Sequence, residues 1–460
     1  MKWNNLSLHK IKWICSFIVV LLPFFCSISN IFQKYLAVTL WAIMMWMFEL
    51  LPEEIVAIML PGLYILFDIT NYAATFSVWT TSTPWITLGG LMIGGMIVKS
   101  GLVLRIAYKS LLLTKGSLKG IVWGIVLTCT IFTPLIPSIM AKVALLVPVV
   151  IGICKVLKVK AKSATASALM LVVFFALWSP KMAFMTASTD SILTAGILEQ
   201  YLGVKITWLA WAKDMFIPGI LWMLVSIPLI YILRPQHLNL NKEYLKIEYR
   251  KLGKITIDEK KTVTLITALL ILLIFSSWHK LPEGVLMLGI GCLGFFLGIG
   301  LLKSDDFSKI QFKVVFFLAG AVTIGAVASS IGITESVINF VQPYFEQMNS
   351  YELVMSIYIF SILANFLLNP LALIATLMIP IANLCSNLGY SATIGGYSMI
   401  MGFNQALFPY EIAPLMLVYG FGYLKLTHLI KVMVFRIVAG IIFMTVVTYP
   451  YWLYIGLLDK

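Results

Sequence analysis

Four of the charged side chains within strongly apolar segments of this 460-residue chain are the residues best suited to bind a ligand there. They are Lys142, Lys181, Asp190 and Glu411. A charge inside a bilayer-spanning segment is costly, so it is expected to face a partner or a ligand. Lys142 follows Ser138 by four positions, and on a helix both would point to the same side. The pattern predicts a binding site for a small anion, with Lys142 as its fixed positive charge.

A structural interpretation of the same charges stays open. Lys142 or Lys181 could pair with Asp190 or Glu411 and hold helices together, and Asp190 could cap the N-terminus of a half-helix. An unpaired ammonium is costly in a low-dielectric site. We therefore expect a substrate carboxylate to satisfy Lys142 when it is bound, and Glu411 or Asp190 to do so when the site is empty.

Hydroxyl and amide side chains near these charges complete the candidate substrate site. Hydroxyls serve equally as backbone caps, and amides in apolar helices also join helices to each other. Arginine is not expected at the site, because Arg105, Arg234, Arg250 and Arg436 fall at predicted span ends or in the central polar loop. The full set of candidate substrate-binding residues is Ser138, Lys142, Lys181, Ser188, Thr189, Asp190, Ser191, Asn369, Asn404, Gln405 and Glu411.

Composition restricts the protein to a membrane class. The chain is 61% hydrophobic and 11% charged, so lipid is its natural solvent. The net charge of +14 comes largely from lysines in short loops, which orient membrane proteins, so no nucleic-acid partner is expected. The six cysteines and four histidines are scattered without metal-ligand spacing, and no P-loop or catalytic triad appears. We therefore expect no enzyme, no metal site and no cofactor.

The apolar segments predict an all-α polytopic membrane protein of about 11 transmembrane helices, beginning with a retained helix at 11–29. Its two halves resemble each other, since four short matches occur in one order at nearly one offset. They pair 51–53 with 281–283, 89–95 with 319–325, 144–148 with 376–380, and 163–165 with 391–393. The predicted parts are an N-terminal helix (1–32), a first repeat (33–234), a cytoplasmic linker (235–261) and a second repeat (262–460).

Lysine distribution predicts the orientation of these repeats. If 118–156 and 350–387 are re-entrant hairpins, the lysine-rich loops all fall on the cytoplasmic side with the N-terminus, and the C-terminus lies outside. The halves then have opposite orientations, and each carries a broken helix. Such inverted repeats bind substrate near the midplane, at the ends of broken helices. The membrane would be the plasma (inner) membrane.

The chain resembles the divalent anion/sodium symporter family of di- and tricarboxylate, citrate and sulfate transporters. The resemblance rests mainly on the run from Leu407-Phe408-Pro409 to Gly422-Tyr423-Leu424-Lys425 and on Trp85 to Leu102. It implies transport of a small anionic metabolite across a lipid bilayer, by a homodimer. The family's two Ser-Asn-Thr hairpin tips and two Thr-Pro-Pro-Asn-like turns bind carboxylate and sodium.

Those motifs are altered here. The first tip reads Ser138-Ile139-Met140, and the turns read Ser188-Thr189-Asp190-Ser191 and Ile412-Ala413-Pro414-Leu415. The second tip reads Leu368-Asn369-Pro370, or Pro370-Leu371-Ala372 if the spacing to Pro380 sets the register. Most side-chain oxygens of a sodium cage are lost, so we expect a sodium-independent exchanger or uniporter of a small organic anion, although backbone carbonyls could still hold sodium. The alternatives are proton coupling through Glu411 or Asp190, a transport-inactive membrane partner protein, and a hydrophobic or zwitterionic substrate.

Overall fold

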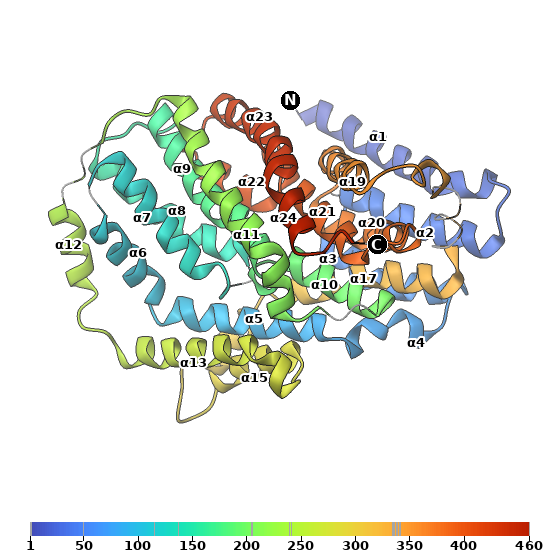
Figure 1. The fold of residues 1–460 in the computed structure, drawn as a ribbon, viewed down its shortest axis with the longest axis horizontal. Helices are drawn as coiled ribbons and strands as arrows, with labels where there is room; N and C mark the ends of the chain where they lie inside the picture. The colour runs from blue at the N-terminus through green and yellow to red at the C-terminus, as the bar shows by residue number, and fades with distance from the viewer. Residues whose placement is uncertain are drawn as a thin grey trace.

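The protein is helical in the part of the chain that its computed structural model describes, and no strand occurs there. The described residues are 2–459 except 49, 115, 137, 204, 205, 239, 241, 334, 335, 337, 338, 340 and 341. Figure 1 shows helices of many lengths and directions, with several spans interrupted rather than straight.

The first half of the chain, up to the central polar segment, contains eleven α-helices and five 3₁₀ turns among its described residues. The α-helices are α1 (Lys2–Leu21), α2 (Asn30–Met47), α3 (Glu53–Leu66), α4 (Tyr72–Thr75), α5 (Ser82–Lys99), α6 (Leu102–Leu113), α7 (Leu118–Phe132), α8 (Ile139–Val156), α9 (Ala164–Trp178), α10 (Thr189–Leu202) and α11 (Trp208–Ser226). The 3₁₀ turns are η1 (Leu22–Phe25), η2 (Ser77–Thr80), η3 (Ser179–Ala183), η4 (Met185–Ala187) and η5 (Ile227–Leu233).

The remaining described helices form the linker and the second half. They are α12 (Lys242–Lys251), α13 (Ile257–Ile274), α14 (Ser276–His279), α15 (Glu283–Leu293), α16 (Ser304–Phe307), α17 (Phe312–Ile331), η6 (Gln342–Tyr344), α19 (Ser350–Ala364), α20 (Pro370–Asn387), α21 (Ala392–Phe403), η7 (Pro409–Glu411), α22 (Ala413–Gly420), α23 (Leu426–Phe443), η8 (Met444–Thr448, a π-helical segment) and α24 (Tyr449–Tyr454).

The order of the helices repeats. A short helix (α3, α15) precedes a long one (α5, α17), then a hairpin (α7–α8, α19–α20), a broken span (α9–α10, α21–α22) and a last long helix (α11, α23). In Figure 1, α5 and α17 run in opposite directions, which is the relation that inverted repeats require. The Thr323 hydroxyl donates to the Thr75 carbonyl and Phe316 packs on Trp79, so the segment leading into α5 also runs antiparallel to α17.

Helices of the second repeat pack against helices of the first. Helix α15 of the second repeat lies along α5 of the first, and α17 of the second lies along α3 of the first. Glycine permits both approaches: a Cβ atom at Gly89 would overlap the Met287 backbone, and one at Gly320 would overlap the Ala57 backbone. The glycine-rich runs that repeat in the sequence are therefore the surfaces on which the two halves interlock.

Two matching helices form the centre of the molecule. In α9 every residue from Thr165 to Trp178 is buried, and in α21 every residue from Ala392 to Phe403 is buried. Both are then interrupted, α9 by the turns η3 and η4 and α21 by a non-helical stretch and η7. Broken backbone at this depth needs hydrogen-bond partners from protein, because lipid provides none. The breaks are therefore the places to look for a site.

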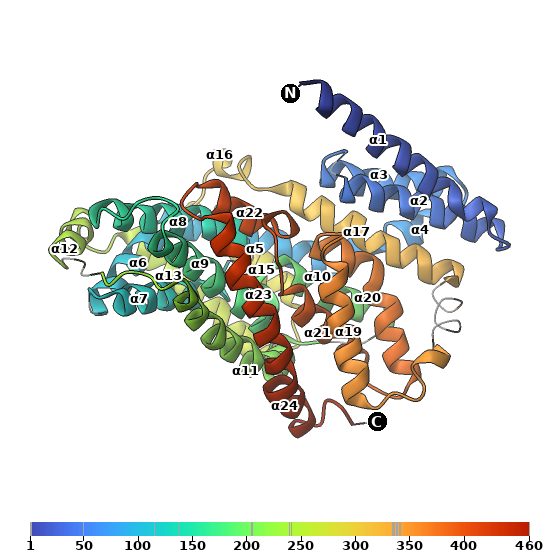
Figure 2. The same ribbon diagram turned by 90° about the horizontal axis from the view of Figure 1, so that it is seen from above.

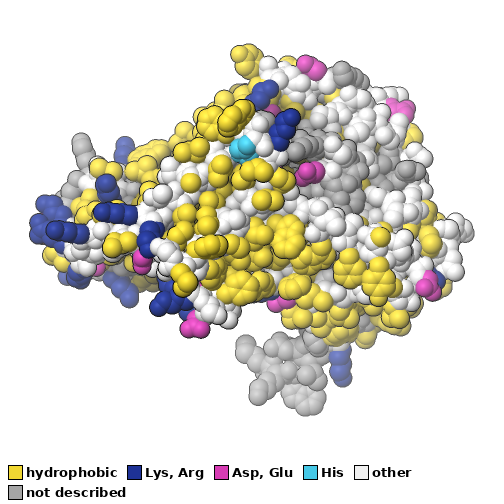
Figure 3. All heavy atoms as spheres, turned by 90° about the horizontal axis from the view of Figure 1, so that it is seen from below, with side chains coloured by type: hydrophobic (Ala, Val, Ile, Leu, Met, Phe, Trp, Pro, Cys, Tyr) yellow, Lys and Arg dark blue, Asp and Glu magenta, His cyan; other side chains and the backbone are white. Residues whose placement is uncertain are grey.

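Six described helical segments are long and apolar enough to cross a membrane, or seven if the α5–α6 pair, bent by 64°, counts as one span. The sequence-based count of about 11 is higher because it includes short or interrupted helices such as α3, α7, α15 and α19. Figure 3 shows hydrophobic side chains over the broad middle of one face and Lys and Arg side chains gathered at one end. That division suits a polytopic protein with a lipid-facing belt.

One buried arginine, Arg105, binds several residues of the predicted linker 235–261. The described part of it contains α12 and the first turn of α13. Buried Arg105 pairs with Glu259 at 2.5 Å and donates to the carbonyls of Leu252, Gly253 and Lys254 at 3.0–3.2 Å. Figure 2 shows the N and C ends on opposite sides of the molecule. Which side is cytoplasmic stays a prediction.

Candidate functional site

The two hairpin tips are built alike. Ser138 caps the N-terminus of α8 by accepting a hydrogen bond from the Ala141 amide at 3.2 Å. Asn369 does the same for α20, accepting from the Ala372 amide at 2.9 Å. Each cap satisfies a free amide and fixes where the second arm of the hairpin begins. The positive ends of both helix dipoles therefore lie at the tips.

Lys142 lies one turn into α8 and is 1% exposed. Its ammonium donates to the Ala187 carbonyl at 3.2 Å, in the break between α9 and α10. No described carboxylate lies within 4.0 Å of it, so the expectation that Asp190 or Glu411 pairs with Lys142 in the empty site is wrong for this conformation. A main-chain carbonyl satisfies this ammonium, and the sequence pattern could not indicate that partner.

Lys181 and Asp190 form a buried ion pair across the first break. The Lys181 ammonium also lies 3.2 Å from the centre of the Trp178 ring, where the π face is attractive to a cation. Asp190 is in the first turn of α10, which Ser188 caps by accepting from the Ser191 amide at 3.4 Å. In this conformation Lys181 and Asp190 pair with each other, which is the structural interpretation of these two charges.

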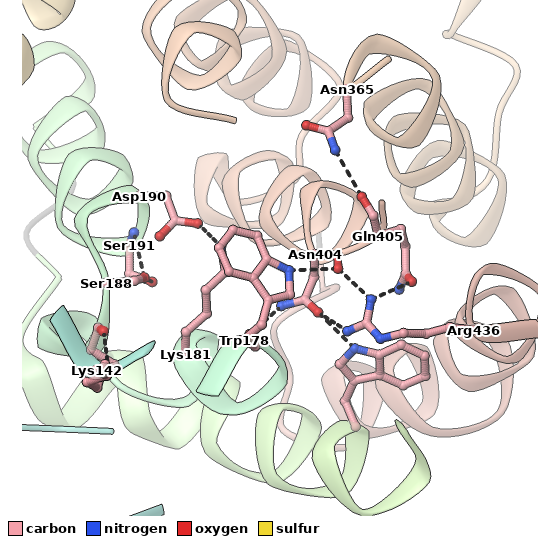
Figure 4. A network of polar contacts seen from close by, with 12 residues as sticks. Lys142, Trp178, Lys181, Ser188, Asp190, Ser191, Asn365, Asn404, Gln405 and Arg436 are labelled. Carbon is pink, nitrogen blue, oxygen red and sulfur yellow. Dashed lines mark hydrogen bonds and ion pairs between the residues drawn. The ribbon is translucent and has the colours of Figure 1, made fainter. Parts of the chain in front are cut away.

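The three hydroxyl candidates of the first break lie at the start of α10. The Ser188 and Ser191 hydroxyls are 2.9 Å apart and both residues are buried, so they bond to each other. Thr189 is the first residue of α10 and is partly exposed. Figure 4 shows Ser188, Ser191 and Lys142 grouped at the first break, apart from the Arg436 cluster.

Arg436 is the clearest correction to the sequence analysis. It was expected at the end of a span, but it lies in the middle of α23 and is 1% exposed. Its guanidinium donates to the backbone and side-chain oxygens of Asn404, both at 2.6 Å, to Gln405 Oε1 at 3.1 Å and to Ser179 Oγ at 3.1 Å. Phe175 and Trp222 lie against it, with ring centres 5.2 and 4.9 Å from Cζ.

This cluster joins the breaks of the two repeats (Figure 4). The Trp178 indole donates to the Asn404 carbonyl at 2.9 Å, and the Asn404 amide donates to the Trp178 carbonyl at 3.0 Å. Trp178 ends α9 and Asn404 follows α21, so equivalent points of the two halves bond to each other directly. We call Trp178, Ser179, Asn404, Gln405 and Arg436 the crossing cluster.

A chain of amides leads from the crossing cluster to Glu411. Asn365, at the end of α19, donates to the Gln405 carbonyl at 3.0 Å and to Glu411 Oε2 at 3.4 Å. The Glu411 carboxylate also accepts from the amides of Leu407 and Phe408, the shortest bond being 2.7 Å. Glu411 thus accepts hydrogen bonds from backbone amides of the second break, as a capping residue does at a helix N-terminus.

Two cavities are lined by the cap residues of the hairpin tips. The first, of about 580 Å³, contains Glu411 and Asn369, and we call it the Glu411 cavity. Met140, from the tip of the first hairpin, also lines it. The second, of about 330 Å³, is lined by Ser138 and by Lys99, Asp306 and Lys309. The Lys99 ammonium pairs with the Asp306 carboxylate and lowers the pKa of that carboxyl.

The buried charges leave the region net positive. The described buried side chains at the two breaks include three cations and two carboxylates. The cations are Lys142, Lys181 and Arg436, and the carboxylates are Asp190 and Glu411. An excess positive charge in a low-dielectric interior favours an anion. Such an arrangement can attract a small anion.

Sequence reasoning missed Arg436 and Asn365. The signal for Arg436 was its position ten residues after Leu426, well inside an apolar run rather than at its edge. Asn365 precedes the Leu-Asn-Pro tip by a turn and had no charge to draw attention to it. The Arg436 guanidinium and the Asn365 amide have partners about 30 or more positions away in the sequence, so local spacing could not reveal them.

Comparison with known proteins agrees with this architecture. The chain is 26% identical over 250 residues to dicarboxylate transporter 1, chloroplastic, of Spinacia oleracea (53% of this chain, 44% of that protein). It is 23% identical over 374 residues to an L-tartrate/succinate antiporter of Shigella dysenteriae (75% and 73%). The chain thus spans less than half the length of the first of these relatives.

A solved structure shares the fold. The YdaH transporter of Alcanivorax borkumensis, whose topology is described as unusual, matches with a TM-score of 0.55 at 14% identity, over 86% of this chain and 90% of that one. The sequence model described as "Sodium:sulfate symporter transmembrane region" matches residues 4–458. The predicted family resemblance is therefore confirmed, and the chain belongs to the sodium:sulfate symporter family.

Proposed function

We propose that the protein is a secondary transporter of small organic dianions of the di- or tricarboxylate type, which it exchanges across the membrane without sodium by alternating access. The names of its relatives, a dicarboxylate transporter and an L-tartrate/succinate antiporter, support the substrate class. The net positive charge around the two breaks supports an anion.

One observation carries the sodium-independent part of the proposal. The Lys142 ammonium binds the Ala187 carbonyl in the first break, and carbonyl oxygens of broken helices are the groups that coordinate sodium in such folds. Ser138, Ser188 and Ser191 are engaged as caps or with each other, so they leave few side-chain oxygens for a cation cage. A tethered ammonium supplies positive charge there without a sodium ion.

Orientation and assembly are further parts of the proposal. The N-terminus and residues 235–261 face the cytoplasm, the C-terminus faces outside, and the protein works as a homodimer in the plasma (inner) membrane. The lysine-rich loops support the orientation. Introduced cysteines in α12 should react with a membrane-impermeant maleimide only after the cells are opened. Reaction in intact cells would reverse the topology.

The test of transport is counterflow into proteoliposomes. Vesicles loaded with unlabelled succinate, L-malate or L-tartrate should take up the same labelled anion from outside, equally in sodium and in choline buffers. A steep requirement for external sodium would refute the sodium-independent part. The absence of counterflow for every anion, from a folded protein, would favour the transport-inactive alternative.

Lys142 is the residue on which this function should depend. Lys142→Ala should abolish counterflow while expression and thermal unfolding stay close to wild type, because it removes one hydrogen bond and the fixed charge of the first break. Lys142→Arg keeps the charge with different geometry and should give partial activity. Exposed Lys109→Ala is the matched control and should transport normally. Normal counterflow by Lys142→Ala, or failure of that variant to fold, would contradict the assignment.

A further inference from the structure

Glu411 is a buried carboxylate without a cationic partner. Its side chain is 2% exposed, and its described partners are the Leu407 and Phe408 amides and the Asn365 side chain. No described lysine, arginine or histidine lies within 4.0 Å of it. Asp190, the other buried carboxylate near the breaks, is neutralised by Lys181. Of the two buried carboxylates at the breaks, Glu411 is therefore the one whose charge its described surroundings compensate less.

The cavity in front of Glu411 does not supply that compensation. Its described polar lining residues besides Glu411 are Glu53, Asn365, Asn369 and Tyr410, with no lysine or arginine among them. A dianion that entered this cavity would face the Glu411 carboxylate, and like charges at close range in a low-dielectric site repel strongly. Binding of the anion thus favours a neutral Glu411.

Cations on the neighbouring elements are not among the residues that line this cavity. Lys12 of α1 donates to the carbonyl of Phe48, a lining residue, at 3.3 Å, but does not line the cavity itself. Arg436 of α23 and the Tyr358 hydroxyl of α19 reach Gln405, on the far side of Asn365 from Glu411. Lys142 of α8 is held by the Ala187 carbonyl. None of these groups is a hydrogen-bond or ion-pair partner of Glu411 in the described structure.

The Asn365 side-chain oxygen can accept a hydrogen bond from a protonated Glu411. Its amide nitrogen donates to the carboxylate, but its own oxygen is buried and has no hydrogen-bond partner among the described residues. A buried acceptor without a donor is destabilising. A protonated Glu411 has an O–H that can donate to this oxygen after the amide turns, so the same side chain can serve both protonation states.

We propose that Glu411 takes up one proton together with the substrate anion, so that each transported anion carries a proton with it. The proton comes from water in the Glu411 cavity, adds to a carboxylate oxygen, and leaves to water when the cavity opens on the other side. Protonation also weakens the bonds that hold the Leu407 and Phe408 amides, so it loosens the second break when substrate is bound. This inference rests on the proposed anion transport and adds its coupling ion.

The experiment varies the pH of each compartment separately. Proteoliposomes without sodium hold the same succinate concentration inside and outside, and labelled succinate counterflow is measured with the lumen, the outer medium or both made alkaline. Counterflow by the wild type should fall when either compartment is alkaline, because each leg of the exchange needs a protonated Glu411 on the side where the anion enters, although the two legs together move no net proton. Protein-free vesicles give the passive leak of succinic acid.

Glu411→Gln removes the titrating carboxylate, so the counterflow of this variant, at whatever rate it runs, should no longer fall when either compartment is made alkaline. Glu411→Asp keeps a titrating carboxylate and should keep that fall. The matched control is Asp258→Asn, which removes an exposed carboxylate in the first turn of α13 and should behave as wild type at every pH.

Each outcome bears on one of the two proposals. Wild-type counterflow that is equally fast at neutral and alkaline pH overturns the proton proposal and leaves anion exchange standing, whether or not Glu411→Gln folds. A pH dependence that persists in a folded Glu411→Gln variant overturns the assignment to Glu411. No counterflow in the wild type overturns the proposed function itself.

Discussion

Arg436 and Asn404 lend themselves to a quantitative test of the crossing cluster. Arg436→Met keeps the apolar stem and removes the guanidinium. Both Asn404 oxygens then keep an indole donor at 2.9 Å, from Trp178 and Trp222, so Gln405 Oε1 is the main acceptor left without a partner. One orphaned acceptor costs about 1–3 kcal/mol, and the relief of an expensive buried charge offsets part of it.

Asn404→Leu should cost more, although it preserves side-chain volume. It removes the 2.6 Å partner of the guanidinium, the acceptor of the Trp222 indole and the donor to the Trp178 carbonyl. Removing one partner of a buried charge destabilises by roughly 3–5 kcal/mol. The double variant should fall short of the sum of the single effects by about 0.5–3 kcal/mol, because no buried cation remains to lose its partner.

The assay is reversible unfolding of the purified protein in mixed micelles by a rising fraction of SDS, followed by circular dichroism. The expected order of stability is wild type, then Arg436→Met, then Asn404→Leu. If Arg436→Met is the less stable single variant, or if the two effects add, the guanidinium itself and not the amide crossing stabilises the breaks.

Two further predictions concern stability. A Cβ atom at Gly440 would come within 2.6 Å of the Gln405 amide, whereas one at Gly289 meets nothing within 4 Å. Gly440→Ala should therefore lower the midpoint of SDS unfolding, and Gly289→Ala should raise it slightly by helix propensity. The pKa of Asp306 is lowered in the folded protein by Lys99, so this pair contributes stability above the ordinary carboxyl pKa and loses it as pH falls through the folded value. Asp306→Asn should be less stable than wild type at neutral pH and low salt, and the difference should vanish in acid and shrink in high salt.

Local patterns in the sequence predict much of this fold. Apolar runs of bilayer length mark the spans, and Pro180 and Pro409 mark the places where two of them break, because proline removes a backbone donor. Ser138 and Asn369 cap the helices that form the second arms of the hairpins. Such a cap can be recognised in the sequence because it involves only four consecutive residues. Even the repeat is visible, since its matches are short strings in a fixed order.

What the sequence does not reveal is which distant groups meet. The exchange of partners between the repeats depends on close backbone approach at Gly89 and Gly320, and nothing local specifies the facing helix. Lys142 is predicted as a buried charge, but its acceptor is a main-chain carbonyl, a group that every residue carries. Arg436 was misplaced because its charge was taken to mark a span end, although it lies ten residues after Leu426, inside an apolar run.

The crossing cluster limits how the site can change shape. Trp178 and Asn404 exchange two hydrogen bonds, and Arg436 ties both to α23. Moving one break away from the other would leave these buried groups without partners, at about 1–3 kcal/mol each. Moving both breaks together keeps every bond. The proposed alternating access, if it preserves the cluster, must therefore shift α9, α21 and α23 as one body against the interlocked helices α3, α5, α15 and α17. On the proposed coupling, Glu411 would gain or lose its proton during that shift.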